Sequence, residues 1–315
     1  MEILHSCDAL PADLRFVVTL GTFDGVHRGH RRVLAATVAE ARARRATPVV
    51  ITFEPHPAAV LRGQPPPLLC DPAERLALIA EAGPAITVVQ PFDRHFAGQS
   101  PAAFLRRLAS GRDLAGVVMT PESAFGQHRA GTLAEVERLA TEIGFAVRAI
   151  EPLELAGGPV SSSRLRELLS AGRLAQARRL LGRHYAVIGE VVAGDRRGRQ
   201  LGYPTANLRF ERPVTLPPDG IYAARAGWGG GDPLRPSERA DGVASLGVRP
   251  TFGGGERTLE VHLFDFNGDV YGQQLRLEFV RRQRGERHFG SSEALISQMD
   301  RDAARARAIL GGRGA

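Results

Sequence analysis

Two histidines three residues apart, His27 and His30, stand where the sequence predicts a phosphate-binding turn. Residues 16–20, FVVTL, are apolar or β-branched and indicate a buried strand, and a helical pattern follows the histidines. The unpaired N–H groups at a helix N-terminus attract anions. Residues three apart lie on one side of the first helical turn, so both imidazoles can face one phosphate. The alternatives are half of a metal site and an exposed helix start.

A second group of polar side chains lies in the string GDRRGRQLGYPTAN, residues 194–207. Its end places the Thr205 hydroxyl and the Asn207 amide on one face of an extended chain. Mg²⁺ accepts such oxygens together with water and phosphate. In the string LEVHLF, residues 259–264, Glu260 alternates with apolar neighbours, and a carboxylate there can take the proton from an attacking hydroxyl. A proline-initiated turn and a surface glutamate are the alternative interpretations.

The string SSSRLR, residues 161–166, puts hydroxyl, N–H and guanidinium donors at a predicted helix start. These donors could converge on the outer phosphates of a nucleotide. An ordinary serine cap followed by solvated arginines explains the same string.

Strands and helices alternate through the first part of the chain. Continuous apolar runs at 48–53, 85–89, 115–119 and 145–150 predict buried strands with helices between them. This order is typical of an α/β domain, with a parallel sheet covered by helices on both faces and ligands beyond the carboxyl ends of its strands. After that part, short alternating segments separated by glycine- and proline-rich turns predict a small antiparallel β-barrel or sandwich, closed by a helix at 292–310. We expect domains at 1–182 and 183–315.

The composition excludes several kinds of chemistry. All 41 basic residues are arginine, so no lysine can bind phosphate in a P-loop or form a Schiff base. The net charge of +7 attracts anions, but the arginines are scattered and only 6% of residues are aromatic, which argues against a nucleic-acid partner. The sequence shows no membrane-spanning run and no secretory signal, and its two cysteines cannot staple a chain of this size. We expect a cytoplasmic protein, either a monomer or a weak homo-oligomer.

The ordered string GTFDGVHRGH, residues 21–30, resembles the H-x-G-H nucleotidyltransferase superfamily, in the form found in the bacterial bifunctional riboflavin kinase/FAD synthetases. The string at 194–207 resembles the riboflavin kinase signature of that family, and EVHL at 260–263 matches its next strand. The likeness extends from Leu20 to about Arg305. It implies a Rossmann-like nucleotidyltransferase domain followed by a riboflavin kinase barrel. Their ligands would be ATP, Mg²⁺, riboflavin and FMN.

The resemblance also implies roles for single residues. In the kinase, Glu260 would be the general base, and the metal ligands would be Thr205 and Asn207. In the adenylyltransferase, the residues acting on the transferring phosphates would be His27, His30 and Arg164.

Further positions would bind the substrates. Nucleotide and phosphate contacts would come from Gly21, Phe23, Asp24, Gly29, His56, Ser161, Ser162, Arg166, Gly194, Arg199, Gly202, Pro204, Thr205 and Asn207. Flavin contacts would come from Phe104, Glu122, Phe125, Arg249 and Arg281. A turn explains His56 equally well, and core packing explains the phenylalanines almost as well.

One segment departs from the family's pattern of glycine, any residue, Asp or Asn, phenylalanine, any residue, phenylalanine and glycine. This chain has TPESAFG at 120–126, so Thr120 replaces the first glycine, Glu122 is longer, and Ser123 replaces an aromatic ring. We predict an enzyme that phosphorylates riboflavin to FMN and adenylates FMN to FAD, releasing pyrophosphate. One alternative is a riboflavin kinase with a degenerate adenylyltransferase domain. The other is a basic nucleotide- or RNA-binding regulator.

Overall fold

The computed structural model describes residues 1–155, 157–194, 198, 202–248 and 257–312. Its contacts divide the chain into two compact units, Met1–Pro66 with Arg75–Ser161, and Pro67–Glu74 with Ser162–Ala315. The second unit begins before the domain boundary expected at 182/183. It includes helices α7 (Ser162–Ser170) and α8 (Leu174–Leu181), because α8 packs against barrel strands β7 and β12.

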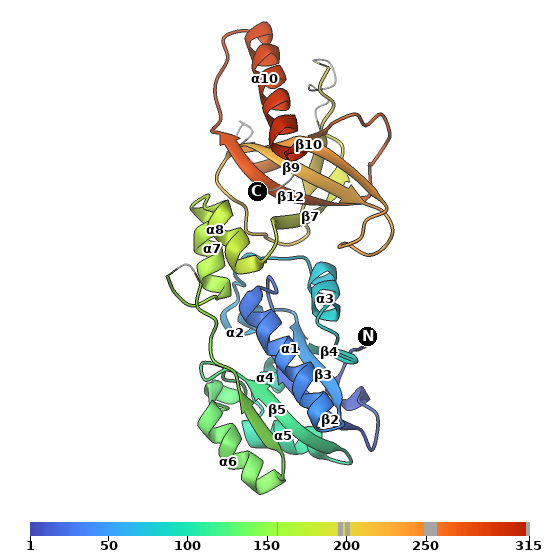
Figure 1. Cartoon of the computed structure of the whole chain (residues 1–315), viewed down its shortest axis with the longest axis vertical. Coiled ribbons are helices and arrows are strands. Elements are labelled where there is room, and N and C mark those ends of the chain that lie inside the picture. The colour runs from blue at the N-terminus through green and yellow to red at the C-terminus, as the bar shows by residue number, and fades with distance from the viewer. Residues whose placement is uncertain (156, 195–197, 199–201, 249–256, 313–315) are drawn as a thin grey trace. The chain divides into compact units, whose positions relative to one another are not determined.

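The first unit is built on a six-stranded parallel sheet in the order β1-β4-β3-β2-β5-β6 (Figure 1). Its strands are β1 (Glu2–Leu4), β2 (Arg15–Leu20), β3 (Thr47–Glu54), β4 (Ile86–Pro91), β5 (Asp113–Met119) and β6 (Ala146–Ala149). The chain builds outward from β2 to β3 and β4, then returns to the other side of β2 for β5 and β6. Ligands of open α/β sheets bind beyond the strand ends at such a reversal.

Helices cover both faces of this sheet, as the sequence predicted. Val17 of β2 packs in one cluster with Val33 of α1 (Arg28–Ala43). The next residue, Val18, packs on the other face in a cluster with Leu105 of α5 (Pro101–Ala109) and Leu139 of α6 (Leu133–Ile143). Alternate side chains of a strand point to opposite faces, so one apolar strand serves both layers. The shorter helices are α2 (Pro57–Arg62), α3 (Pro72–Ala80) and α4 (Arg94–Ala97).

The second unit is a closed antiparallel barrel in the order β10-β11-β8-β7-β12-β9. Its strands are β7 (Tyr185–Val192), β8 (Ala206–Arg209), β9 (Gly220–Trp228), β10 (Glu238–Val248), β11 (Arg257–Leu263) and β12 (Gln274–Arg284). Closure pairs every strand on both sides, so the sheet has no open edge. The barrel is therefore the correct one of the two architectures that the sequence left open.

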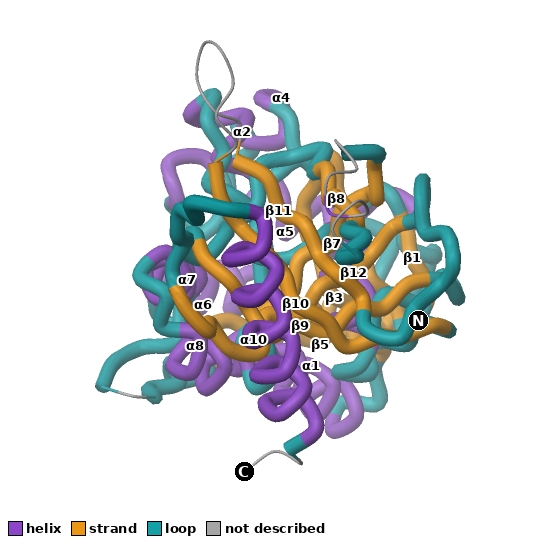
Figure 2. Tube along the Cα trace, turned by 90° about the horizontal axis from the view of Figure 1, so that it is seen from above, coloured by secondary structure: helices purple, strands orange, loops and turns teal. Residues whose placement is uncertain are grey.

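The closing helix α10 (Ser292–Gly311) packs against β9, β10 and β12 (Figure 2). A buried ion pair fixes it there. The Nε atom of Arg284, on β12, donates to Oδ1 and Oδ2 of Asp302 at 3.1 and 3.0 Å, and its Nη2 lies 2.6 Å from Oδ2. The amide of Gln298 donates to the same carboxylate at 2.9 Å. Arg284 thus ties α10 to the barrel through this carboxylate, and Gln298 on the same helix braces it.

Candidate functional site

The loop between β2 and α1 has a strained backbone. Phe23, Gly25 and Val26 have positive φ angles of 48°, 78° and 33°. Such angles are rare for residues other than glycine and often occur at functional sites. The Phe23 ring is buried and meets the His30 ring edge to face, with 5.2 Å between centroids. That packing holds the loop in place at the point where the sheet order reverses.

The two predicted histidines lie together at the start of α1. Nδ1 of His27 accepts the backbone N–H of His30 at 3.2 Å, so the ring proton of His27 is on Nε2. The two imidazoles stack with centroids 3.6 Å apart. Burial, and then the neighbouring His27, hold the pKa of His30 well below its usual 6.5. The ring of His30 is therefore neutral at pH 7. Its Nδ1 is buried without a hydrogen-bond partner among the described residues.

Gly29 allows a close approach of two chain segments beside these histidines. A Cβ atom at this position would lie 3.1 Å from Nδ1 of His27 and 3.2 Å from the carbonyl oxygen of Val160. Both distances are tighter than ordinary van der Waals contact. Glycine thus lets the backbone just before Ser161 pass next to the first turn of α1, which brings the beginning of SSSRLR to the histidine pair.

The rest of SSSRLR belongs to the second unit. Ser162, Arg164 and Arg166 lie in the first turns of α7, and all three are half-buried. The Nε atom of Arg166 donates to the carbonyl of Pro67 at 2.9 Å. Their contact with a nucleotide stays a prediction.

His56 caps a helix. Its Nδ1 accepts the backbone N–H of Ala58 at 3.1 Å at the start of α2, the role that the turn interpretation expected. The carboxylate of Asp24, in the loop after β2, is buried as well. Whether either residue also contacts a nucleotide stays a prediction.

A cavity of about 520 Å³ opens beyond the ends of β2, β3 and β5. Its wall includes Gly21 and Thr22 from the loop after β2. Phe104 and Phe125, both predicted flavin contacts, line it with their rings edge to face at 5.8 Å. An apolar cavity of this size with a few polar groups is typical of small-molecule sites. Glu122, the third predicted contact in this region, is exposed and lies outside the described lining.

The segment that departs from the family's pattern forms a closed turn. The hydroxyls of Thr120 and Ser123 lie 2.8 Å apart, and the N–H of Ser123 donates to the carbonyl of Thr120 at 3.0 Å. Ser123 lines the cavity. At its rim, His128 and Arg129 have positive φ angles of 54° and 58°. Thr120 and Ser123 thus satisfy each other's hydrogen-bonding groups, and the cavity is present beside them.

The barrel brings the predicted kinase residues together. The Thr205 hydroxyl donates to Oε2 of Glu260 at 3.0 Å, and Glu260 on β11 pairs in register with Asn207 on β8. A Cβ atom on Gly194 would overlap the side-chain amide of Asn207, so a larger residue there would displace that amide. The carbonyl of Pro204 accepts a hydrogen bond from Nδ1 of His262 at 2.8 Å. Cross-strand register therefore places one hydroxyl, one amide and one carboxylate side by side.

Two cavities share this cluster. Glu260 and Thr205 line one of about 700 Å³, and Thr205 also lines a second of about 300 Å³. Tyr203, in the wall of the larger cavity, donates its hydroxyl to Asp300 of α10. Burial, and then that carboxylate, raise the pKa of Tyr203 to about 12, so the phenol keeps its proton. Thr205 thus stands where the two cavities meet.

Two predicted positions of this unit are described but lie apart from the cluster, and two more are not described. Arg281 is exposed and lies outside the described lining of the larger cavity, which Arg284 lines instead. Gly202 has a φ of 84°, a conformation that favours glycine, but it is exposed. Arg199 and Arg249 lie outside the described residues.

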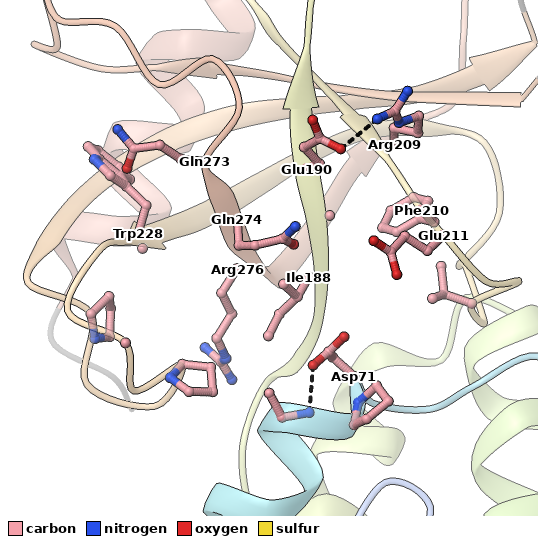
Figure 3. A pocket seen from close by; sticks show the side chains of 18 of the residues that line it. Asp71, Ile188, Glu190, Arg209, Phe210, Glu211, Trp228, Gln273, Gln274 and Arg276 are labelled. Atoms are coloured by element: carbon pink, nitrogen blue, oxygen red, sulfur yellow. Dashed lines mark hydrogen bonds and ion pairs between the residues drawn. The ribbon is translucent and has the colours of Figure 1, made fainter. Parts of the chain in front are cut away.

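A third cavity of the second unit, of about 620 Å³, is shown in Figure 3. Charges in its wall are paired within the protein: Glu190 binds Arg209 at 2.6 Å, and Arg276 binds the buried Glu74 at 2.9 Å. Trp228, the single tryptophan of the chain, lies in this wall. None of the described wall residues was predicted to bind a substrate.

The sequence analysis missed several residues that shape these sites. Tyr203 and His262 lie inside the recognised strings but were given no role there, Asp302 lies outside them, and Ser123 was noted only as a departure. Arg75, on α3, is a buried arginine whose guanidinium reaches the ends of two strands. A single arginine in a helix gives no pattern that could identify it.

Comparison with known proteins covers nearly the whole chain. A family model described as riboflavin kinase matches residues 181–310, and one described as FAD synthetase matches residues 11–164. A bifunctional riboflavin kinase/FMN adenylyltransferase of Escherichia coli K12 is 35% identical over 98% of this chain and 96% of its own length. One of Bacillus subtilis 168 is 34% identical over 91% of this chain and 90% of its own.

Among solved structures, a protein of Streptococcus pneumoniae called a macrolide-efflux protein superposes with a TM-score of 0.84. It is 28% identical and covers 97% of this chain and 98% of its own. That name describes the pneumococcal protein alone. In the described part of this chain, no helix combines the length and apolar character needed to cross a bilayer.

Proposed function

Because the chain belongs to the family of bifunctional riboflavin kinase/FMN adenylyltransferases, we propose that its barrel phosphorylates riboflavin to FMN and that its first unit adenylates FMN to FAD. The observation that carries this proposal is the hydrogen bond between Glu260, in the wall of the larger cavity, and Thr205, which lines both cavities. This hydrogen bond places a general base, Glu260, beside Thr205, where we propose that the phosphate binds.

In the kinase reaction, Glu260 takes the proton from the 5′-hydroxyl of riboflavin as that oxygen attacks the γ-phosphate of ATP. Glu260 lines the larger cavity, which suits the flavin, and Thr205 also lines the smaller one, which suits the nucleotide. The Thr205 hydroxyl donates a hydrogen bond to the Glu260 carboxylate. This bond fixes the direction in which the remaining lone pair of the carboxylate points. Residues of α10, among them Leu295 and Met299, form part of the wall of the larger cavity.

Thr205 and Asn207 would hold a magnesium ion in this reaction. Their hydroxyl and amide oxygens are hard donors, and Gly194 leaves room for the amide. No group of three His, Cys, Asp or Glu side chains suited to a metal occurs among the described residues, so phosphate and water would complete the coordination. When bound, the ion would neutralise charge on the transferring phosphate.

In the adenylyl transfer, a phosphate oxygen of FMN attacks the α-phosphorus of ATP and pyrophosphate leaves. The protein needs to align the two substrates and stabilise charge, since no covalent intermediate is required. His27 and His30 would donate hydrogen bonds to the nucleotide phosphates. The isoalloxazine ring would lie in the cavity lined by Phe104 and Phe125. The closed turn at Thr120 supports an intact flavin cavity over the alternative of a degenerate domain.

We further propose that the protein works in the cytoplasm and acts on small molecules. The two cysteines, Cys7 and Cys70, are buried and unbridged, as in proteins of a reducing cytoplasm. Small molecules suffice as reaction partners.

The test is to incubate the purified protein with ATP and Mg²⁺ and either riboflavin or FMN, then separate the flavins by chromatography. We expect FAD from both. Conversion of riboflavin to FMN with supplied FMN unchanged would leave the kinase alone. Removal of Mg²⁺ by EDTA should stop FMN formation from riboflavin.

A variant separates the two reactions. Glu260→Gln should lower FMN formation from riboflavin by roughly 100-fold or more, a typical loss for a general base. FAD formation from supplied FMN should be unchanged. Equal loss of both reactions would contradict separate sites.

A further inference from the structure

Arg75 is a buried cation in the first unit. It lies on α3, its side chain is only 5% exposed, and it lines none of the cavities described above. An unpaired buried charge is costly, so a buried arginine normally has partners. In Arg75 the two Nη atoms make the contacts, whereas the buried Nε has no hydrogen-bond partner in the described part of the chain. The partners of this guanidinium therefore indicate what it does.

The guanidinium connects the ends of two neighbouring strands. Nη2 donates to Oε2 of Glu54 at 3.0 Å and to the carbonyl of Phe53 at 3.4 Å, both at the end of β3. Nη1 lies 3.5 Å from the carbonyl oxygen of Thr22, in the loop after β2. The planar guanidinium directs its two Nη groups to different acceptors in a fixed geometry, which suits such a bridge.

The Thr22 carbonyl is held from a second direction. The hydroxyl of Thr52, a fully buried residue of β3, donates to it at 3.2 Å. Thr22 lines the cavity of about 520 Å³. The next residue, Phe23, has a strained backbone and packs its ring on His30. A displacement at Thr22 would therefore move both the cavity wall and the histidine pair.

We propose that Arg75 is a positioning residue for adenylyl transfer. By tying the Thr22 carbonyl to the end of β3, it keeps the histidine pair and the flavin cavity aligned with each other. The inference rests on the proposed function of the first unit. Arg75 touches neither substrate; it acts through the loop.

A purely structural role predicts something different. If Arg75 only neutralised Glu54, removing both charges together would restore the enzyme. If it positions Thr22, the double variant would stay slow, because the carbonyl would still lack the guanidinium. Arg75→Met keeps the side-chain length and removes its donors, and Glu54→Gln removes the partner's charge.

The experiment measures FAD formation from supplied FMN in the full chain. In Arg75→Met and in Arg75→Met/Glu54→Gln we expect kcat to fall roughly 10- to 100-fold with little change in KM for ATP, since a displacement of about 1 Å can cost about 100-fold. FMN formation from riboflavin should stay at the wild-type rate. As a matched control, Arg138→Met removes an arginine of the same unit that is exposed and paired with Glu135 at 2.8 Å, and should leave both rates unchanged.

A wild-type kcat in Arg75→Met, or recovery in the double variant, would overturn the inference. If Arg75→Met does not fold, Thr52→Val tests the same carbonyl without disturbing a charge. It should lower kcat severalfold, and an unchanged kcat would count against a role for this carbonyl. A wild-type chain that forms no FAD from FMN would contradict the proposed function itself, before any variant is made.

Discussion

The histidine pair shows how neighbouring residues keep a buried imidazole uncharged. The rings of His27 and His30 stack with their centroids 3.6 Å apart. At this distance, charging both rings in a buried turn would be opposed by electrostatic repulsion. Burial and the neighbouring ring therefore keep His30 neutral.

This arrangement predicts how stability depends on pH. In the folded chain the pKa of His30 lies well below 6.5, whereas in the unfolded chain it is ordinary. As pH falls below about 6.5, His30 takes up a proton in the unfolded state but not in the folded state. The free energy of unfolding of the first unit therefore falls by up to about 1.4 kcal/mol per pH unit. Above that pH the residue contributes no pH dependence.

Thermal unfolding of the wild type and of His30→Gln between pH 5 and 8 measures the effect. The variant should show a shallower loss of stability between pH 6.5 and 5. Parallel curves across this range would contradict the neutral, buried state of His30.

At the scale of the element, α10 depends on one buried ion pair. The side chains of Arg284 and Asp302 are 13% and 7% exposed, and the helix they hold lines the larger barrel cavity. Asp302→Ala would leave a buried guanidinium unpaired, which typically costs about 3–5 kcal/mol. We expect a loss of about 3 kcal/mol in the barrel's free energy of unfolding and slower phosphorylation of riboflavin, as measured by urea denaturation and by FMN formation.

The chain offers a matched control for this variant. Asp265 and Arg307 also join the barrel to α10, but their side chains are 76% and 51% exposed. Asp265→Ala should cost less than about 1 kcal/mol, because solvent screens exposed pairs. Equal effects of the two variants would contradict the role given to burial.

How well the elements could be predicted depended on their length and regularity. The apolar run at 48–53 became β3, and the closing helix expected at 292–310 became α10. The short strand β1 was missed, because three residues give no measurable period, and β8 was expected only as an extended chain holding Thr205 and Asn207. In β12, register shifts between Phe279 and Arg281 and between Arg282 and Arg284 break the alternation. The sequence therefore could not show which of these arginines lines the cavity.

The same distinction applies to the candidate sites. Residues in compact strings, such as His27 and Thr205, were found because neighbours along the chain identify them. The hydrogen bond between Thr205 and Glu260 depends on strand register, and the bridge from Arg75 to Thr22 depends on how a helix packs against strand ends. These are tertiary contacts that no local pattern contains.

At the scale of the whole molecule, the two candidate cavities belong to different compact units. The cavity with Phe104 and Phe125 lies in the first unit, and the one with Glu260 lies in the second. If FMN leaves the second unit before it is adenylated, two damaged chains should complement each other. A mixture of Glu260→Gln and His27→Asn, each unable to make FAD from riboflavin, should form FAD. Chromatography of the flavins measures this, and a mixture without FAD would mean that FMN does not pass through solution.

The position of the single tryptophan has a practical consequence. Trp228 is buried on β9 with its ring edge to face against Phe266, entirely within the second unit. Its fluorescence therefore reports on the barrel alone, while circular dichroism registers both units. Comparing the two signals would show whether the units unfold together or one at a time. Because flavins absorb where indole emits, a riboflavin molecule bound in the barrel should also quench the fluorescence of Trp228 by energy transfer. This quenching would give a binding assay that needs no label.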